Sequence, residues 1–220
     1  MRTTNVSLVS VTLVSVTLVS VTFAFASIVA APPASACGMA IRREVDARSV
    51  GIAKAERALQ QGQFAAAALN VTQVFPTIRA AQTGNDPLVS RGLRVMALAV
   101  GRSDGAVTLG NDWRGATPAQ RAQNLEWAAA TLRTLSTANA GDPSLQSDLG
   151  ETLARLVRFH GEALKILDGL AQRDLLGSAQ GYAALARLRA AAGDKAGRDT
   201  AAVRCQAMTQ TPAICAVPNG

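Results

Sequence analysis

The sequence predicts an all-α fold built from antiparallel helix pairs. Hydrophobic residues make up 49% of the 220 residues, but aromatic residues make up only 4%. This composition favours helices packed through small side chains over a β-sandwich, which uses more aromatic and β-branched residues. After residue 47, apolar residues recur at three- and four-residue steps, the spacing of one helix face. Glycines and Asp-Pro pairs interrupt these runs, where we expect helices to end and begin.

The stretch 52–78 shows one such pair most clearly. Gly62 separates two apolar runs, and we expect the first helix to end there because glycine adopts the left-handed C-cap conformation without steric cost. One pair cannot bury its apolar face alone, so the pattern predicts neighbouring pairs. The positions on the two faces are Ile52, Ala55 and Leu59, then Phe64, Ala67, Val71, Val74 and Ile78.

Residues 1–36 predict a signal peptide for export. No charged residue lies between Arg2 and Arg42, and the sequence LVSVT occurs three times within residues 8–22. A basic start, a long apolar segment and small residues before a cleavage site are the features of a secretory signal, and we expect cleavage after Ala36. The apolar segment is also long enough for an uncleaved N-terminal anchor. A start codon upstream of the true one would give the same pattern.

In the oxidising compartment that export implies, two of the three cysteines can form a disulfide. Cys205 and Cys215 lie close together near the C-terminus, and we expect them to form a disulfide. Cys37 directly follows the predicted cleavage site, which resembles the acylated cysteine of a bacterial lipoprotein, although Ala34 replaces the leucine of that pattern. Cys37 is therefore either lipidated and attached to a membrane, or a free thiol or intermolecular bridge. We expect a periplasmic, outer-membrane-attached or secreted protein.

The positive charge does not predict a nucleic-acid partner. The formal net charge is +7, from 22 basic and 15 acidic residues. The basic residues are interspersed with acidic ones, and no basic run exceeds the pair Arg42-Arg43. A nucleic-acid binder concentrates positive charge on one face and usually adds stacking aromatic side chains.

The second pair is interrupted by a long loop. Asp86-Pro87 predicts a helix start, with Asp86 as N-cap and Pro87 in the first turn. Periodicity disappears over 101–117, which we interpret as a loop insertion longer than most connections in a compact domain. Trp113 in this loop either packs onto the helices or contacts a partner. The apolar face of the helix before it is Leu88, Gly92, Val95 and Ala99.

Three further segments complete the helical region. Thr117-Pro118 starts a helix with a face of Ala122, Leu125, Ala129, Leu132 and Ser136. Asp142-Pro143 starts the next, and we expect it to bend or break near His160-Gly161 before continuing to about Leu175. Gly193-Asp194 divides the last pair. The faces of these later helices are Leu145, Leu149, Leu153 and Leu156; Leu164, Leu167 and Leu170; Tyr182, Leu185, Leu188 and Ala192; and Ala196, Thr200, Val203 and Ala207.

Over residues 47–208 this layout resembles the tetratricopeptide repeat, a helix-turn-helix unit of about 34 residues. Small residues in a first helix, a glycine at the turn and an amphipathic second helix occur in both 51–76 and 181–208. The resemblance implies a short tetratricopeptide-type α-solenoid. Residues 37–46 would be a lead-in, and 209–220 a C-terminal tail closed by the disulfide.

The sequence predicts no enzyme, no cofactor and no metal site. The only histidine is His160, and one histidine cannot form a metal cluster. The Gly-rich stretch 101–110 lacks the lysine and spacing of a phosphate-binding loop. Cysteine, histidine and acidic residues are not arranged as in a thiol enzyme or a general acid–base pair.

The function predicted is therefore binding to another protein or peptide. In the resembling family the first helices of the pairs line a concave groove that receives peptides or partner helices. Arginines there can form bidentate bonds with acidic groups of a partner. We expect an exported scaffold module of the bacterial cell envelope, or alternatively a basic module for membrane surfaces or cell wall. The predicted groove positions are Glu56, Arg91, Asp148, Arg155 and Arg187, with Trp113 in the loop as a further contact.

Overall fold

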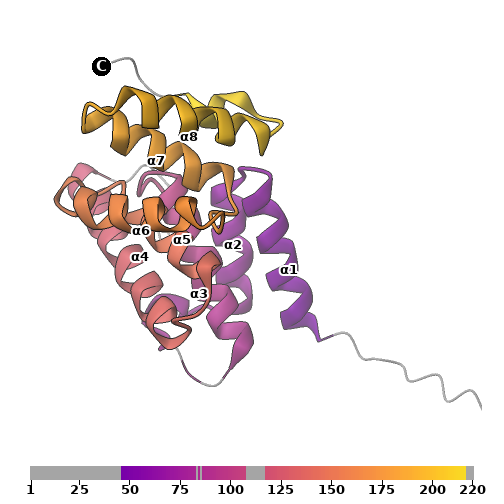
Figure 1. The fold of residues 1–220 in the computed structure, drawn as a ribbon. Coiled ribbons are helices and arrows are strands. Elements are labelled where there is room, and N and C mark those ends of the chain that lie inside the picture. The colour runs from indigo at the N-terminus through magenta and orange to yellow at the C-terminus, as the bar shows by residue number, and fades with distance from the viewer. Residues whose placement is uncertain (1–45, 83, 85, 108–116, 217–220) are drawn as a thin grey trace, which may run out of the picture. The chain divides into compact units, whose positions relative to one another are not determined.

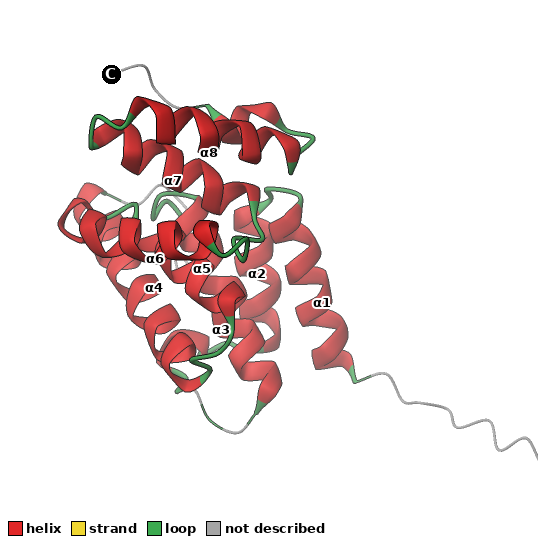
Figure 2. Cartoon of the chain, viewed as in Figure 1, coloured by secondary structure: helices red, strands yellow, loops and turns green. Residues whose placement is uncertain are grey.

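The computed structural model of this chain describes residues 46–82, 84, 86–107 and 117–216. All regular structure in these residues is helical, with eight α-helices, three short 3-10 helices and no strand (Figures 1 and 2). The prediction of an all-α fold is therefore confirmed. These helices all belong to one compact unit, Arg43–Gly220.

The α-helices are α1 (Ala47–Gln60), α2 (Phe64–Val74), α3 (Pro87–Arg102), α4 (Pro118–Ala138), α5 (Pro143–Leu153), α6 (His160–Gln172), α7 (Ala179–Ala191) and α8 (Lys195–Ala207). The 3-10 helices are η1 (Ile78–Ala80), η2 (Val157–Phe159) and η3 (Pro212–Cys215).

The predicted helix starts are confirmed. Asp86 and Asp142 each accept a hydrogen bond from a backbone amide in the first turn of α3 and α5, and a proline follows each of them. Thr117 forms a reciprocal capping box with Gln120 at the start of α4. Such caps satisfy amides that have no partner within the helix, and each contributes about 1 kcal/mol.

The ends of four helices share one backbone motif. After α1, the amide of Gln63 donates to the carbonyl of Ala58 (2.9 Å), and Gly62 has a φ of 74°. This is a Schellman motif, in which the left-handed residue lets the chain reverse direction. Equivalent hydrogen bonds close the ends of α3, α6 and α7, where the left-handed residues are Asp104, Asp174 and Gly193.

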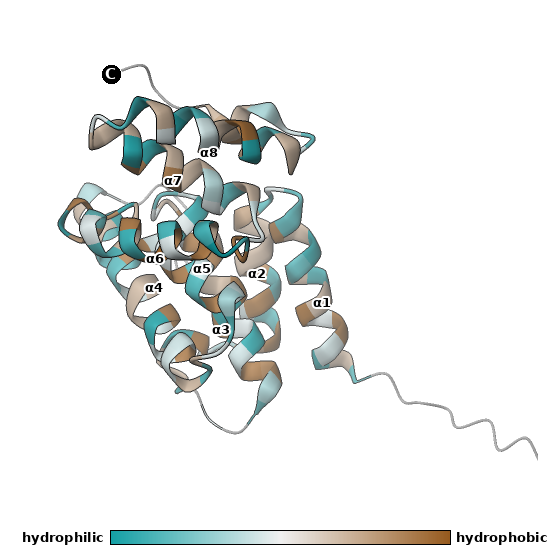
Figure 3. Ribbon diagram, viewed as in Figure 1, coloured by the Kyte–Doolittle hydropathy of each residue, from teal (hydrophilic) through white to brown (hydrophobic). Residues whose placement is uncertain are grey.

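Each helix packs against the next one in the sequence, and α1, α3, α5 and α7 also pack in that order against one another. The pair α7–α8 lies together at the top of Figure 1. Helix α3 is central, because every residue from Val95 to Gly101 is buried. Most helices carry both hydrophobic and hydrophilic stretches (Figure 3). Fully buried large side chains include Ile52, Val71, Leu93, Met96, Leu132, Leu153, Leu167 and Leu185.

Three details of the predicted helices need correction. Ile78 is buried, but it lies in η1 and not in the second helix. The break in the third pair comes earlier than expected, because α5 ends at Leu153 and His160 is already the first residue of α6. The predicted face of α8 is wrong: Val203 is 64% exposed, and the buried positions are Ala201 and Cys205. One of these two buried positions, Cys205, forms the disulfide to the C-terminal tail.

The structure describes the first part of the predicted loop insertion 101–117. Helix α3 continues to Arg102, and residues 103–107 fold back as turns against α4. The side-chain amide of Asn124 donates to the carbonyls of Gly105 (3.1 Å) and Val107 (3.3 Å). Trp113 lies outside the described residues. Trp127, the other tryptophan, is half-buried and donates from its indole to the carbonyl of Arg79 (3.3 Å).

The predicted signal peptide 1–36 and Cys37 lie outside the described residues, and so does the lead-in 37–46 except for Asp46. The carboxylate of Asp46 caps α1 by accepting from the amide of Arg48 (3.0 Å). Within the described ranges, no helix has the length and apolar character needed to cross a bilayer.

Candidate functional site

Helix α5 carries a row of buried polar side chains. Ser147, Asp148, Glu151 and Thr152 are each less than 5% exposed, and they recur at the spacing of one helix face. Burying polar groups costs free energy unless they find partners. The hydroxyls of Ser147 and Thr152 have no hydrogen-bond partner in the described part of the chain. A polar row of this kind in the middle of a fold is a candidate for function.

Two arginines of α3 pair with the two acids of this row. Arg94 contacts Asp148 from its Nε atom (2.5 Å), and the side chain of Arg94 remains 37% exposed. Arg102 donates from Nε and Nη2 to the two carboxylate oxygens of Glu151 (2.8 and 3.1 Å). This second pair is deeply buried, with side-chain exposures of 11% and 3%. The two pairs join α3 to α5 through charge as well as packing.

Burial and neighbouring charges change the pKa of two groups in these pairs. Burial raises the pKa of Asp148 from 3.8 to about 6, because desolvation of the carboxylate outweighs the attraction of Arg94. Burial alone would lower the pKa of Arg102, but the charge and hydrogen bonds of Glu151 outweigh it and the pKa is raised. Arg102 therefore stays charged and is held by Glu151.

Arg155 and Arg187 differ from the other arginines of this region, because neither forms an ion pair with a described carboxylate. Arg155 lies just after α5, and its Nε is buried without a hydrogen-bond acceptor among the described residues. The pKa of Arg187 on α7 is lowered, first by burial and then by the positive charge of Arg155. Both side chains are partly buried, and both line the second pocket described below.

Two adjoining pockets open on this region. The first, of about 380 Å³, lies beside Arg94 and Asp148 and is also lined by Glu56, Ser144, Ser147 and Ser178. The second, of about 440 Å³, lies beside Arg155 and Arg187 and is also lined by Phe64, Gln180, Ala183 and Ile214. Gln60 and Arg102 line both pockets. Residues of α1, α3, α5 and α7 therefore share one hollowed face, which we call the charged face.

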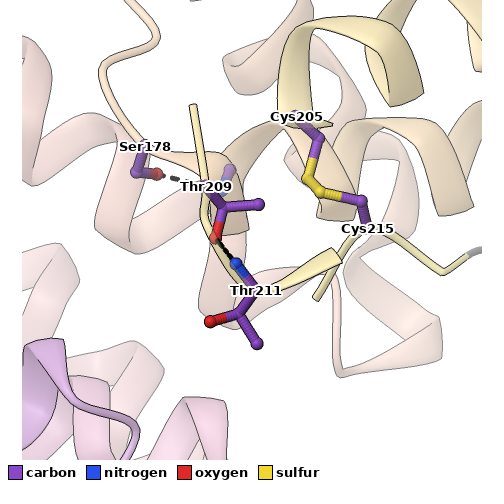
Figure 4. Close-up of a disulfide and its surroundings, with 6 residues drawn as sticks. Ser178, Cys205, Thr209, Thr211 and Cys215 are labelled. Carbon is purple, nitrogen blue, oxygen red and sulfur yellow. Dashed lines mark hydrogen bonds between the residues drawn. A yellow bond between two sulfur atoms is a disulfide. The ribbon is translucent and has the colours of Figure 1, made fainter. Parts of the chain in front are cut away.

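The C-terminal tail forms one wall of the second pocket. The predicted disulfide between Cys205 and Cys215 is present, and it fixes η3 to the end of α8 (Figure 4). η3 also packs against α7, and the amide of Thr211 donates to the hydroxyl of Thr209 (3.0 Å; Figure 4). The tail residues Thr211, Ala213, Ile214 and Ala216 line the pocket. The disulfide thus holds in place a surface that faces Arg155 and Arg187.

The structure brings some of the predicted contact residues together. Arg155 and Arg187 line the same pocket, and Asp148 lines the adjoining one. Arg91 lines neither pocket, and its guanidinium instead forms a two-point ion pair with Glu56 (3.0 and 2.7 Å). Trp113 and Cys37 lie outside the described residues.

Sequence reasoning missed Arg94, Arg102 and Glu151. A signal existed, because Arg94 and Arg102 are eight residues apart on one helix, two steps of four along a single face. Asp148, Glu151 and Arg155 likewise follow at three- and four-residue steps. The leucines at 145, 149, 153 and 156 define the apolar face of this segment, but nothing in the spacing indicates that its polar face is buried as well.

No group of three or more His, Cys, Asp or Glu side chains that could hold a metal ion occurs in the described ranges. His160 begins α6 and lines neither pocket. Comparisons with protein-family models, with curated proteins and with solved structures found no match to this chain.

Proposed function

We propose that this chain is an exported protein-binding module of the bacterial cell envelope, and that its helix pairs stack as a short solenoid of the tetratricopeptide type. The charged face would be the binding surface. The main support for this proposal is that α1, α3, α5 and α7 share one hollowed face. These are the first helices of the four pairs, which line the groove in repeat proteins of this kind.

The chemistry of the charged face suits a polar, partly acidic segment of a partner protein. The charged residues that line the two pockets are four arginines (Arg94, Arg102, Arg155 and Arg187) and two acids (Glu56 and Asp148), which gives a formal charge of +2. Arginine is enriched in protein interfaces because its planar guanidinium forms several directed hydrogen bonds and also packs against apolar groups. Leu59, Val95 and Leu98 line the first pocket but are almost fully buried, so we expect charge complementarity to orient the partner there.

A basic membrane-surface or cell-wall module is less well supported. Such a module needs its positive charges on one face. The exposed lysines of the described chain, Lys54, Lys165 and Lys195, lie on three different helices, α1, α6 and α8. Many exposed arginines are ion-paired, as Arg133 is with Glu162 (2.8 Å).

Attachment to a membrane through Cys37 is a separate proposal. Intact mass of the protein purified from cells expressing the full chain would test it. Acylation adds a large, defined increment to the mass of residues 37–220, whereas simple cleavage after Ala36 adds none. A mass equal to that of the whole chain would contradict both cleavage and acylation.

Site-specific photo-crosslinking tests the binding surface. A photo-reactive amino acid is placed at Gln60, which lines both pockets, in cells expressing the full chain. The matched control is Gln73, an exposed glutamine of α2 that lines neither pocket. We expect a defined covalent adduct with one protein from position 60 and none from position 73. Equal adducts from both positions, or an adduct from position 73 alone, would contradict the proposed surface.

A further inference from the structure

We propose that the second pocket is a binding site for a small organic anion, specifically a carboxylate with a short apolar body. The anionic group would lie between Arg155 and Arg187, and the body would pack against Phe64 and the disulfide-fixed tail. This inference does not depend on the partner-binding function, because it rests only on the residues that line this pocket.

The first argument is an unmet hydrogen bond. The Nε–H of Arg155 is buried and has no acceptor in the described part of the chain. A buried donor without a partner is destabilising, and more so when the group is charged. Glu151, four residues before Arg155 in the sequence, is held by Arg102 through both of its oxygens. The Nε atom itself is closed off from the pocket, so an acceptor there would bond to the terminal Nη groups of Arg155 and balance the charge of the guanidinium.

The second argument is the proximity of like charges. Arg155 and Arg187 line the same pocket, and neither is fully exposed. Burial and the positive charge of Arg155 lower the pKa of Arg187, and the charge of Glu151 only partly offsets them. A negatively charged group between the two arginines would replace their mutual repulsion by two attractive interactions. Guanidinium groups bind carboxylates through two parallel hydrogen bonds, which gives direction as well as strength.

The third argument is the composition of the remaining walls. Phe64, Ala183 and Ile214 supply apolar surface, and Gln180 supplies an amide. A volume of about 440 Å³ lies within the range of small-molecule pockets, which are roughly 300–1,000 Å³. A bare inorganic anion would leave the apolar walls uncovered. The pocket therefore fits a ligand with one charged end and one apolar end.

Calorimetric titration of the protein, purified after expression of the full chain, tests this site. The probes are benzoate, benzamide and inorganic phosphate. Benzoate has the charge and the apolar body, benzamide has only the body, and phosphate has only the charge. We expect benzoate to bind at least tenfold more tightly than either of the others. Benzamide or phosphate binding as tightly as benzoate would overturn the proposal.

Variants locate the site. Arg155→Gln and Arg187→Gln should each weaken benzoate binding at least tenfold. The matched control is Arg204→Gln, which removes one positive charge from an exposed arginine paired with Asp174 and should leave binding unchanged. Unchanged binding in both pocket variants would overturn the assignment.

An NMR titration of the unmodified protein covers the case in which a pocket variant does not fold. The Nε–H resonance of Arg155 should shift with benzoate and not with benzamide. A resonance that benzoate leaves in place would overturn the assignment even if no variant could be made.

Discussion

The guanidinium of Arg102 on α3 forms a two-point ion pair with the carboxylate of Glu151 on α5, where both side chains are almost fully buried. This pair lies at the boundary between the two pockets, since Arg102 lines both of them. A buried ion pair adds little net stability compared with apolar residues, but losing one partner leaves a charge without compensation. We infer that the pair fixes the geometry of the charged face.

The two members of this pair should be strongly coupled. Arg102→Met or Glu151→Met alone should lower the free energy of unfolding by about 3–5 kcal/mol, because each leaves an unpaired buried charge. The double variant should lose much less than the sum of the two single losses. Urea unfolding of the three variants measures the coupling. Additive losses would show that the two side chains do not interact in solution.

Asp148 should make stability depend on pH. Its pKa is about 6 in the folded protein and 3.8 ordinarily, so the folded state binds its proton more tightly than the unfolded state does. The stability from this group is present below pH 4 and is lost as the pH rises through 6. Relative to Asp148→Asn, the free energy of unfolding of the wild-type protein should fall by about 2–3 kcal/mol between pH 3.5 and 7.

The two proteins are compared by urea unfolding at each pH, so that all other titrating groups cancel in the difference. A difference that stays constant, or that favours the wild-type protein as the pH rises, would contradict the burial of this carboxylate.

Gly101 should not tolerate a side chain. A Cβ atom there would lie 2.9 Å from the hydroxyl and 3.4 Å from the methyl carbon of Thr152, where α3 approaches α5. Gly101→Ala should therefore be destabilising by about 1–3 kcal/mol. The matched control is Gly169→Ala in α6, where no atom lies within 4 Å and the helix should gain up to about 1 kcal/mol. Thermal unfolding measures both, and a stabilising Gly101→Ala would refute the close approach of α3 and α5.

Breaking the Cys205–Cys215 disulfide should release the tail. The two cysteines are separated by 10 positions, and closing a loop of this length contributes about 2–3 kcal/mol to stability. Reduction should lower the free energy of unfolding by that amount and should weaken benzoate binding. The variant Cys205→Ser/Cys215→Ser should resemble the reduced protein and should not respond to reductant. Benzoate affinity that reduction leaves unchanged would show that the tail is not a wall of the pocket.

Much of the fold could be predicted because local signals determine it. Asp86 and Asp142 mark helix starts through their side chains, and Gly62 and Gly193 mark helix ends through a conformation that glycine adopts easily. These effects involve only a few neighbouring residues and can be read from the sequence.

The incorrect predictions concern features that depend on residues far apart in the sequence. The buried face of α8 includes Cys205, which is bonded to the tail, and the charged face depends on which acid each arginine meets across the helices. Arg91 and Arg155 look alike in the sequence, but Arg91 meets Glu56 and Arg155 meets no described acid. Only the packing of the helices distinguishes them.

The most direct test of the charged face is the photo-crosslink from position 60 in two double variants of equal net charge. Arg155→Gln/Arg187→Gln removes the two arginines without described acidic partners, and Arg91→Gln/Arg133→Gln removes two that are ion-paired and line neither pocket. We predict that the adduct is lost in the first double variant and retained in the second. An adduct of equal yield in both would contradict the charged face as the partner-binding surface.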